Sequence, residues 1–210
     1  MIIAVDGPLA AGKGTIAKAL SAIYGLPFMD TGKLYRGVAY RLLEAGDDPH
    51  DRVAALHAAE TLDMADIEDA CLRTASVGSG ASVVAAIQPV RSALFNLQRK
   101  FALQVGGAVL DGRDIGTVVA PEADVKIYVY ASPQERAARR QKELAENGEH
   151  ISFEDMLAQT LERDERDSNR ADAPLKPADD AHLLDTTGLS IEDAVEKARL
   201  IVEHALLAKS

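Results

Sequence analysis

The sequence predicts an α/β fold with a parallel sheet of about five strands and helices on both faces. Short apolar runs typical of buried strands alternate along the chain with longer amphipathic segments. The first apolar run leads through a glycine-bounded loop directly into a helical segment, as in a βα unit. The length of 210 residues, 47% of them hydrophobic, suits a single domain with a sizeable core.

The glycine-bounded loop has the composition of a phosphate-binding loop. It joins the predicted strand 2–6 to the predicted helix 16–23 and reads Gly7-Pro8-Leu9-Ala10-Ala11-Gly12-Lys13-Gly14-Thr15. The backbone N–H groups of such a loop, together with the positive end of the next helix, bind an anion. Lys13 would reach the β- and γ-phosphates of a nucleotide, and Gly12 and Gly14 would let the backbone approach the phosphate oxygens.

The loop departs from the usual motif directly after the lysine. A Ser or Thr that ligates Mg²⁺ commonly stands there, whereas this chain has Gly14, with Thr15 one position later. The sequence therefore assigns no metal ligand. The alternative interpretation is a glycine-rich turn that binds nothing, but the complete strand–loop–helix context favours a nucleotide-phosphate site. As a cation on a surface loop, Lys13 is expected to have no packing role.

Charge and cysteine content exclude several classes of protein. A net charge of −10 argues against broad nucleic-acid binding, and the single cysteine, Cys71, excludes an internal disulfide and fits a reducing compartment. The five histidines have no partner at metal-ligand spacing. The chain enters a strand at once, and no apolar run approaches the roughly 20 residues that span a bilayer. We expect a cytoplasmic monomer without membrane or nucleic-acid partners.

The remaining elements follow from apolar runs and capping patterns. Further strands are predicted at 26–30, 106–112, 124–130 and 182–185. Helices are predicted at 33–44, 52–62, 82–103 (broken or kinked by Pro89), from 133, at 152–170 and at 190–207. Three of them start with a serine that has a carboxylate three residues later: Ser132, Ser152 and Ser190. Asp30 or Thr31 is expected to cap the helix at 33–44, and the segment 64–80 is expected to be irregular.

Arginine is concentrated in one part of the chain. Six of the 14 arginines lie within 35 residues: Arg136, Arg139, Arg140, Arg163, Arg166 and Arg170. A phosphoryl-transfer enzyme must neutralise two anions and exclude water, and arginine binds phosphate bidentately while staying charged. The arginines therefore favour phosphoryl transfer over simple nucleotide binding.

The helix at 152–170 has the pattern of a lid. Arg163, Arg166, Asp167 and Arg170 follow i, i+3, i+4, i+7 spacing, so we expect one face that closes over a triphosphate. The alternative is a solvated helix with ion pairs supplied by Glu162, Asp164, Glu165 and Asp167. A surface charge run is the corresponding alternative for Arg139 and Arg140.

Four further stretches carry a family resemblance. They are Asp30-Thr31-Gly32 with Tyr35-Arg36, Ser82 with Pro89-Val90-Arg91, the run from Asp111 to Val119, and the run from Arg163 to Arg170. Together with the phosphate loop, they resemble the bacterial-type cytidylate kinases of the nucleoside-monophosphate kinase family, over nearly the whole chain. The last two runs are highly specific in combination, whereas the phosphate loop alone is not.

The resemblance implies a three-layer P-loop nucleoside-monophosphate kinase fold with a helical lid. Its parts would be a core (about 1–30, 104–147 and 178–210), a monophosphate-binding region (about 31–103) and a lid (about 148–177). It also implies ATP with Mg²⁺ at the phosphate loop and CMP or dCMP at a facing site. Small inserted antiparallel sheets are usual in the monophosphate-binding region of this family. Here only nine residues separate Asp63 from Arg73, so the insert near 63–80 is shortened.

Matching positions imply a role for each site residue. Loop residues Gly7, Pro8, Ala10, Ala11, Gly12, Lys13, Gly14 and Thr15, with Arg139, would hold ATP. Arg36, Arg113 and Arg170 would hold the CMP phosphate, with Thr31 among the substrate-binding residues. Ser82, Arg91 and Asp114 would read cytosine, and Arg163 and Asp167 would meet the sugar hydroxyls. Lys13, Arg113, Arg163 and Arg170 would be the catalytic residues.

The chemistry of cytosine agrees with this assignment, because its N4 donor and its N3 and O2 acceptors suit Asp, Ser and Arg. No aromatic stacking platform is expected. Two other functions stay open: a kinase of the same fold with another small acceptor, and a nucleotide-dependent switch without turnover.

Overall fold

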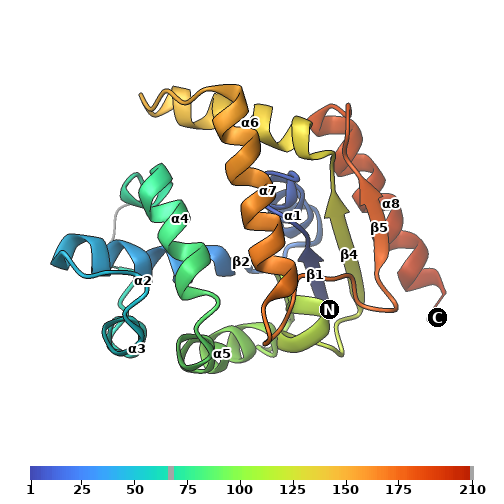
Figure 1. Ribbon diagram of the computed structural model, residues 1–210. Helices are drawn as coiled ribbons and strands as arrows, with labels where there is room; N and C mark the ends of the chain where they lie inside the picture. The colour runs from blue at the N-terminus through green and yellow to red at the C-terminus, as the bar shows by residue number, and fades with distance from the viewer. Residues whose placement is uncertain (66–68, 209–210) are drawn as a thin grey trace.

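The computed structural model describes residues 1–65 and 69–208. Its sheet has five strands in the order β2-β3-β1-β4-β5, namely β1 (Ile2–Asp6), β2 (Phe28–Asp30), β3 (Ala108–Gly112), β4 (Val125–Tyr130) and β5 (His182–Asp185). All neighbouring strands are parallel, and Ile3 of the central strand is in register with Val109 and Val125 (Figure 1). The predicted parallel sheet of about five strands is confirmed.

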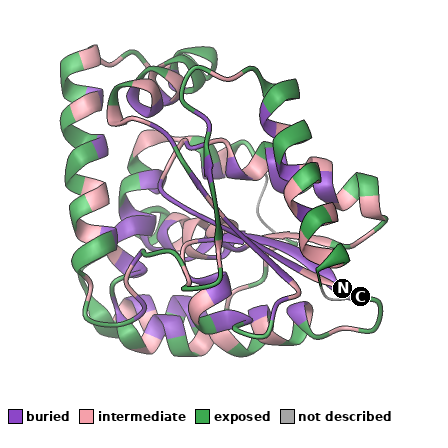
Figure 2. Ribbon diagram, turned by 90° about the vertical axis from the view of Figure 1, so that its right-hand side faces the viewer, coloured by how far each residue is buried: buried purple, intermediate pink, exposed green. Residues whose placement is uncertain are grey.

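Alternate side chains of β1 enter apolar cores on opposite faces of the sheet. Ile3 and Val5 pack with helices α1 (Lys13–Tyr24) and α8 (Ile191–Leu207), whereas Ala4 packs with Ile115 and the end of α5 (Gln88–Ala102). The inner strands β1, β3 and β4 are largely buried, while the outer helix faces are exposed (Figure 2). A parallel sheet needs this cover on both faces, so its strand ends become the natural place for a ligand.

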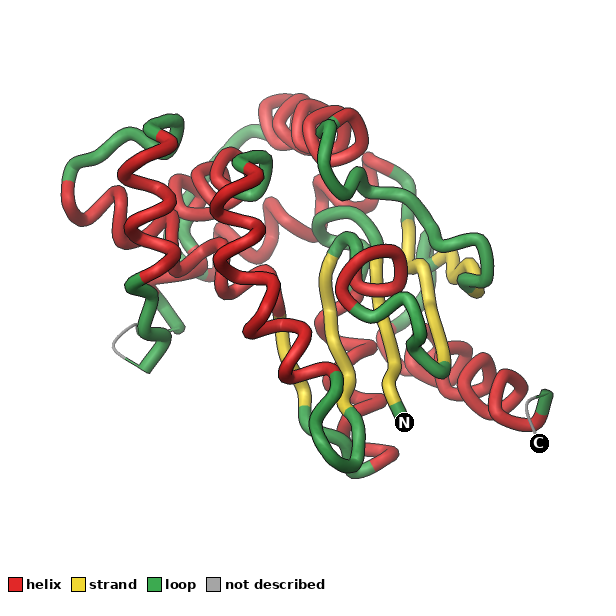
Figure 3. Tube along the Cα trace, turned by 90° about the horizontal axis from the view of Figure 1, so that it is seen from below, coloured by secondary structure: helices red, strands yellow, loops and turns green. Residues whose placement is uncertain are grey.

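The other helices form two groups beside the sheet. The first group, α2 (Thr31–Ala45), α3 (Arg52–Glu60), α4 (Ala75–Val84) and α5, shares a small core that contains Val38, Ala55 and Val90. The second, α6 (Pro133–Glu146) and α7 (Phe153–Asn169), packs through Ala137, Leu144 and Met156. Helix α7 also contacts α4, so it connects the second group to the first. Figure 3 shows the first group standing to one side of the strands.

Capping predictions are confirmed at three helices. The side-chain oxygens of Ser132, Ser152 and Ser190 accept hydrogen bonds from the backbone N–H three residues later. Asp30 takes the N-cap position of α2 but makes no side-chain cap bond. Its carboxylate instead accepts a hydrogen bond from Arg36. This bond holds the Arg36 guanidinium at the carboxyl end of β2.

The predicted break in the helical segment 82–103 is confirmed, because the structure has two helices there. Helix α4 ends at Val84, and α5 starts at Gln88 with Pro89 in its first turn. Proline lacks an N–H and has a fixed φ, so it suits the first turn of a helix rather than its interior. The break therefore precedes the proline.

The segment 64–80, predicted to be irregular, is in part helical. Helix α4 begins at Ala75 behind a cap at Thr74, and a 3₁₀ turn occupies Cys71–Arg73. A Cβ at Gly80 would lie 3.1 Å from the Cβ of Ala39, so the small residues of α4 allow close packing on α2. Residues 66–68 of the predicted short insert lie outside the described residues. The described part of the insert contains no strand.

Candidate active site

The carboxyl ends of β1, β2 and β3 open into a cleft of about 680 Å³, bordered by α2, α4, α6 and α7. Eleven Lys and Arg side chains line it against six Asp and Glu, an excess of five positive charges in a chain whose net charge is −10. The protein thus concentrates its cations in one place. A cleft of this kind attracts anionic ligands.

The loop after β1 leaves a helix N-terminus free for an anion. Gly7 has φ +143°, and a Cβ there would lie 1.9 Å from the carbonyl oxygen of Val129, so only glycine fits. Gly12, with φ +91°, precedes α1 and makes no side-chain cap. The first N–H groups of α1 are therefore available to phosphate oxygens. Of the predicted loop residues, Gly7, Pro8 and Ala11 are buried behind the cleft wall.

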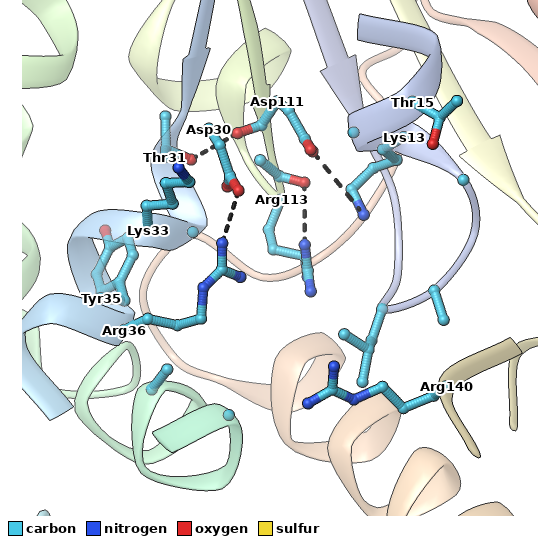
Figure 4. A pocket seen from close by; sticks show the side chains of 18 of the residues that line it. Lys13, Thr15, Asp30, Thr31, Lys33, Tyr35, Arg36, Asp111, Arg113 and Arg140 are labelled. Atoms are coloured by element: carbon cyan, nitrogen blue, oxygen red, sulfur yellow. Dashed lines mark hydrogen bonds and ion pairs between the residues drawn. The ribbon is translucent and has the colours of Figure 1, made fainter. Parts of the chain in front are cut away.

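Lys13 lies at the floor of the cleft rather than on an exposed loop. Its side chain is 6% exposed, and Nζ donates a hydrogen bond to the carbonyl oxygen of Pro8 at 2.7 Å. Nζ also lies 3.9 Å from Oδ1 of Asp111 (Figure 4). Burial, followed by the nearby Arg113, lowers the pKa of Lys13, and Asp111 partly offsets this. The expectation that Lys13 has no packing role is wrong, because the cation fills the space between the loop and β3.

Acidic residues at the ends of β2 and β3 complete the floor. The Thr31 hydroxyl donates to the backbone carbonyl of Asp111 at 2.8 Å, which ties the two strand ends together. Nη2 of Arg36 donates to Oδ2 of Asp30 at 2.6 Å. Burial raises the pKa of Asp111 despite Lys13. Our sequence reasoning did not assign Asp30 and Asp111 to the site, although both end a predicted strand.

Helix α7 covers the cleft from above. Nη1 of Arg163 donates to the carbonyl oxygen of Gly78 on α4 at 2.9 Å. The Asp167 carboxylate accepts from Nε of Arg113 at 3.1 Å and from the Ser82 hydroxyl at 3.4 Å. Burial raises the pKa of Asp167, but Arg113, Arg163 and Arg170 outweigh it, so the pKa is lowered. The cleft-facing side of α7 and helix α4 therefore contact each other directly.

The prediction that Arg166 shares this face is wrong. Arg166 pairs with Glu162 at 2.5 Å on the outer side of the helix. Adjacent residues lie about 100° apart around an α-helix, so Arg166 is turned away from Asp167. The solvated-helix alternative thus describes the outer face of α7, while Arg163, Asp167 and Arg170 line the cleft.

Asp114 and Arg91 form a buried ion pair at the end of the cleft, and Arg170 lies close by, with Nη2 3.6 Å from Oδ1 of Asp114. Arg113 turns toward Asp167 instead, and Asp114 makes no side-chain cap bond to the π-helical turn Ile115–Val119. The Tyr35 hydroxyl accepts from Nη1 of Arg91 at 3.4 Å. Tyr35 lines the cleft beside this pair.

Three buried arginine nitrogens have no hydrogen-bond partner among the described residues: Nε of Arg91, Nε of Arg163 and Nη2 of Arg170. Each lies near a carboxylate, of Asp172, Asp167 and Asp114 respectively, at 3.3, 4.0 and 3.6 Å, without forming a hydrogen bond. Buried donors in folded proteins are nearly always hydrogen-bonded, so these three leave room for acceptors from a bound anion. Burial and the nearby Arg113 also lower the pKa of Arg163 to about 9. Two like charges held together in this way are relieved when an anion binds between them.

The opposite end of the cleft contains residues that our sequence reasoning missed. Nη2 of Arg139 donates to the carbonyl oxygen of Thr186 at 2.8 Å, and the Thr186 hydroxyl donates to that of Ala11 at 2.9 Å. Leu189 and Ile191 add apolar wall beside them, and Arg140 also lines the cleft. The only sequence signal for Thr186 and its neighbours was their place directly after the last predicted strand.

A parallel α/β sheet with a phosphate loop at its carboxyl edge, facing an arginine-bearing lid helix, defines a P-loop phosphotransferase. The family model for cytidylate kinase matches residues 3–204 of the chain. The cytidylate kinase of Methylocella silvestris is 55% identical over 205 residues, covering 98% of this chain and 95% of that protein. That of Bradyrhizobium diazoefficiens is 52% identical over 210 residues, covering 100% and 99%. The chain belongs to the cytidylate kinase family.

Solved structures show the same fold at low identity. An uncharacterized protein from Eubacterium ventriosum superposes with a TM-score of 0.59 at 14% identity, covering 97% of this chain and 98% of that one. A gluconokinase from Sinorhizobium meliloti gives a TM-score of 0.50 at 16% identity, covering 97% and 91%. These matches support the fold alone.

Proposed function

We propose that the protein transfers the γ-phosphoryl group of ATP to CMP or dCMP, in pyrimidine nucleotide metabolism. The observation that carries this proposal is a single cleft with a phosphate loop at one end and the buried Arg91–Asp114 pair at the other. The first end suits a nucleoside triphosphate, and the second suits the hydrogen-bonding edge of a base. Membership of the cytidylate kinase family supports cytosine as that base.

ATP would lie with its phosphates on the loop 7–15 and its base toward Leu189 and Ile191. Lys13 would leave the carbonyl of Pro8 for the β- and γ-phosphates, and Arg139 would stand beside them. Because Arg139 is held by Thr186, its guanidinium is already oriented before the nucleotide arrives.

CMP would occupy the other half of the cleft. Arg36, Arg113 and Arg170 would hold its phosphate, with Thr31 fixing the strand ends beneath it. The carboxylate of Asp114 would accept from N4 of cytosine, while Arg91 and Ser82 complete the base edge. Asp167 and Arg163 would contact the sugar.

The attacking phosphate oxygen needs no general base at neutral pH, so catalysis would be positioning and charge neutralisation. Lys13, Arg113, Arg163 and Arg170 would surround the transferred group. Arginines that line a water-poor cleft stabilise the charge of a loose phosphoryl transition state far more than they would in water.

Mg²⁺ would be supported by Asp111. A Cβ at Gly14 would lie 3.3 Å from Oδ2 of Asp111, so a carboxylate occupies the neighbourhood where the usual hydroxyl ligand is missing. No cluster of three or more His, Cys, Asp or Glu suited to a metal occurs in the described ranges. This fits Mg²⁺, which is commonly bound through one or two carboxylates together with substrate phosphates. When bound, the ion would neutralise charge on the ATP phosphates.

A coupled ADP-release assay with CMP, dCMP, UMP and AMP side by side tests the proposal. We expect turnover with CMP and dCMP above that with UMP and AMP. Turnover only with another acceptor would favour the rival kinase, and nucleotide binding without ADP release would favour the switch.

Monomeric, cytoplasmic action without nucleic-acid partners stays a prediction from composition. Among the described helices, none is long and apolar enough to cross a membrane.

A further inference from the structure

A second ion pair, made by a buried arginine, joins the lid helix to the region of the phosphate loop. Arg136 on α6 is 3% exposed, and its guanidinium binds Asp164 on α7 through two parallel hydrogen bonds, 2.9 Å from Nη1 to Oδ1 and 2.5 Å from Nη2 to Oδ2. The described lining of the cleft includes neither residue. The pair can therefore act on the reaction only through other groups.

The same guanidinium also holds two backbone segments. Nε donates to the carbonyl oxygen of Ala131 at 3.0 Å, directly after β4, and Nη1 donates to that of Leu9 at 3.3 Å. Leu9 belongs to the phosphate loop and precedes Ala10, which has φ +57°, a conformation costly for any residue except glycine. The Arg136 side chain thus contacts the chain directly after β4, the phosphate loop and helix α7.

The opposite side of α7 is attached to the monophosphate-binding helices. Arg163 donates to Gly78 of α4, and Asp167 accepts from Ser82 of the same helix. Arg163 directly precedes Asp164, about 100° away around the helix. The Asp164–Arg136 contact therefore fixes the core side of α7, while the preceding residue, Arg163, reaches across the cleft. In Figure 1, α7 descends from the level of α6, with α4 to its left.

We infer that the Arg136–Asp164 pair is a positioning device for phosphoryl transfer, which docks the lid helix on the phosphate loop and so aims Arg163 at the transferred group. The inference rests on the proposed function. A buried Arg that loses its carboxylate is strongly disfavoured, so the pair favours the docked arrangement of α7 over an undocked one. Displacing catalytic groups by about 1 Å can cost about a hundredfold in rate, which is the scale of the expected effect.

The experiment compares Asp164→Asn with Glu162→Gln, a matched control that removes a carboxylate from the exposed Arg166 pair on the same helix. We expect Asp164→Asn to lower kcat at saturating ATP and CMP by at least about tenfold, and to speed amide exchange in α7. The ratio of kcat/KM for CMP and UMP should stay near that of the wild type, because Arg91 and Asp114 are untouched. Glu162→Gln should keep kcat within about twofold of the wild type, as expected for an exposed pair.

Two conservative variants keep the test decisive if Asp164→Asn does not fold. Asp164→Glu retains the carboxylate and should recover much of kcat, whereas Arg136→Lys retains the charge but loses the paired geometry and should not. A loss of thermal stability with unchanged kcat per folded molecule would overturn the inference, as would equal kcat losses in Asp164→Asn and Glu162→Gln. A wild-type protein that fails to phosphorylate CMP would instead refute the proposed function.

Discussion

The guanidinium of Arg91 and the carboxylate of Asp114 pair at the closed end of the cleft, where both side chains are less than one-tenth exposed. Asp114 makes this contact instead of a cap bond to the turn that follows β3, so its carboxylate lines the cleft. Nε of Arg91 is buried without a hydrogen bond in the described structure, and a carboxylate oxygen of Asp172 lies 3.3 Å from it. An acceptor-only carboxylate beside the donors of Arg91 suits the hydrogen-bonding edge of cytosine and repels the O4 carbonyl of uracil.

Asp114→Asn should narrow the preference for CMP over UMP. The carboxylate accepts from N4 of cytosine but faces the O4 carbonyl of uracil, and a buried unpaired polar group costs about 1–3 kcal/mol. Asparagine adds a donor that can satisfy O4, so kcat/KM should fall for CMP and fall less, or rise, for UMP.

The matched control for that substitution is Asp172→Asn, which neutralises a half-exposed carboxylate 3.3 Å from Nε of the same arginine. In this control, the ratio of kcat/KM for CMP to kcat/KM for UMP should stay at the wild-type value. Equal losses on both substrates in Asp114→Asn would show that Asp114 is only structural.

Lys13→Met should nearly abolish turnover. Methionine fills the buried space of the lysine stem, so the substitution removes the charge without leaving a void beside Asp111. Steady-state kinetics and a thermal melt on the same sample separate catalysis from folding. Turnover within about tenfold of the wild type would limit the contribution of Lys13 to about 1.4 kcal/mol and contradict its role at the phosphates.

The segment from about residue 148 to 177 should exchange its amide hydrogens more slowly when an ATP analogue and CMP are bound together. On its cleft side, Arg163 contacts Gly78 and Asp167 contacts Arg113. Ligands that accept hydrogen bonds from the cleft arginines would hold the segment closed. Hydrogen exchange with mass spectrometry measures this, with β1 as the internal control. Unchanged exchange on addition of both ligands would favour a static helix. The division into core, monophosphate-binding region and lid stays a prediction until then.

Asp6→Asn should flatten the pH dependence of stability. The buried Asp6 carboxylate accepts from the backbone N–H of Ile115 at 2.8 Å and of Gly116 at 2.7 Å. Burial, outweighing these two bonds and assisted by Asp114 and Asp111, raises the pKa of Asp6 to about 7 from 3.8. Between these values the folded state binds more protons than the unfolded state, so the free energy of unfolding falls as pH rises through this window.

Urea denaturation at several pH values from about 5 to 8 checks this prediction. The free energy of unfolding of the wild-type protein should fall as pH rises toward 7, because the folded Asp6 loses its proton at a higher pH than the unfolded one. Asp6→Asn should lack this part of the pH dependence. Parallel curves for the two proteins would show that Asp6 does not titrate in this range.

Local patterns sufficed for much of the fold and part of the site. The strand Ile2–Asp6, the phosphate loop and the serine caps of α6, α7 and α8 were predicted because each depends on residues close together in the chain. Asp114, Arg113 and Arg163 were assigned by resemblance, and the structure brings them to one cleft. The assignments of individual roles stay predictions.

What the sequence by itself determined was the parallel sheet, the loop that receives phosphate and the family. The tertiary structure alone decided which charges meet, because Arg136 and Asp164 are 28 residues apart and Asp6 and Ile115 are 109 apart. It also decided that α4 is a helix, since its small residues have little amphipathic pattern and gain stability by packing Gly80 on Ala39. Contacts between distant segments depend on how the elements pack, and local propensity carries no information about that choice.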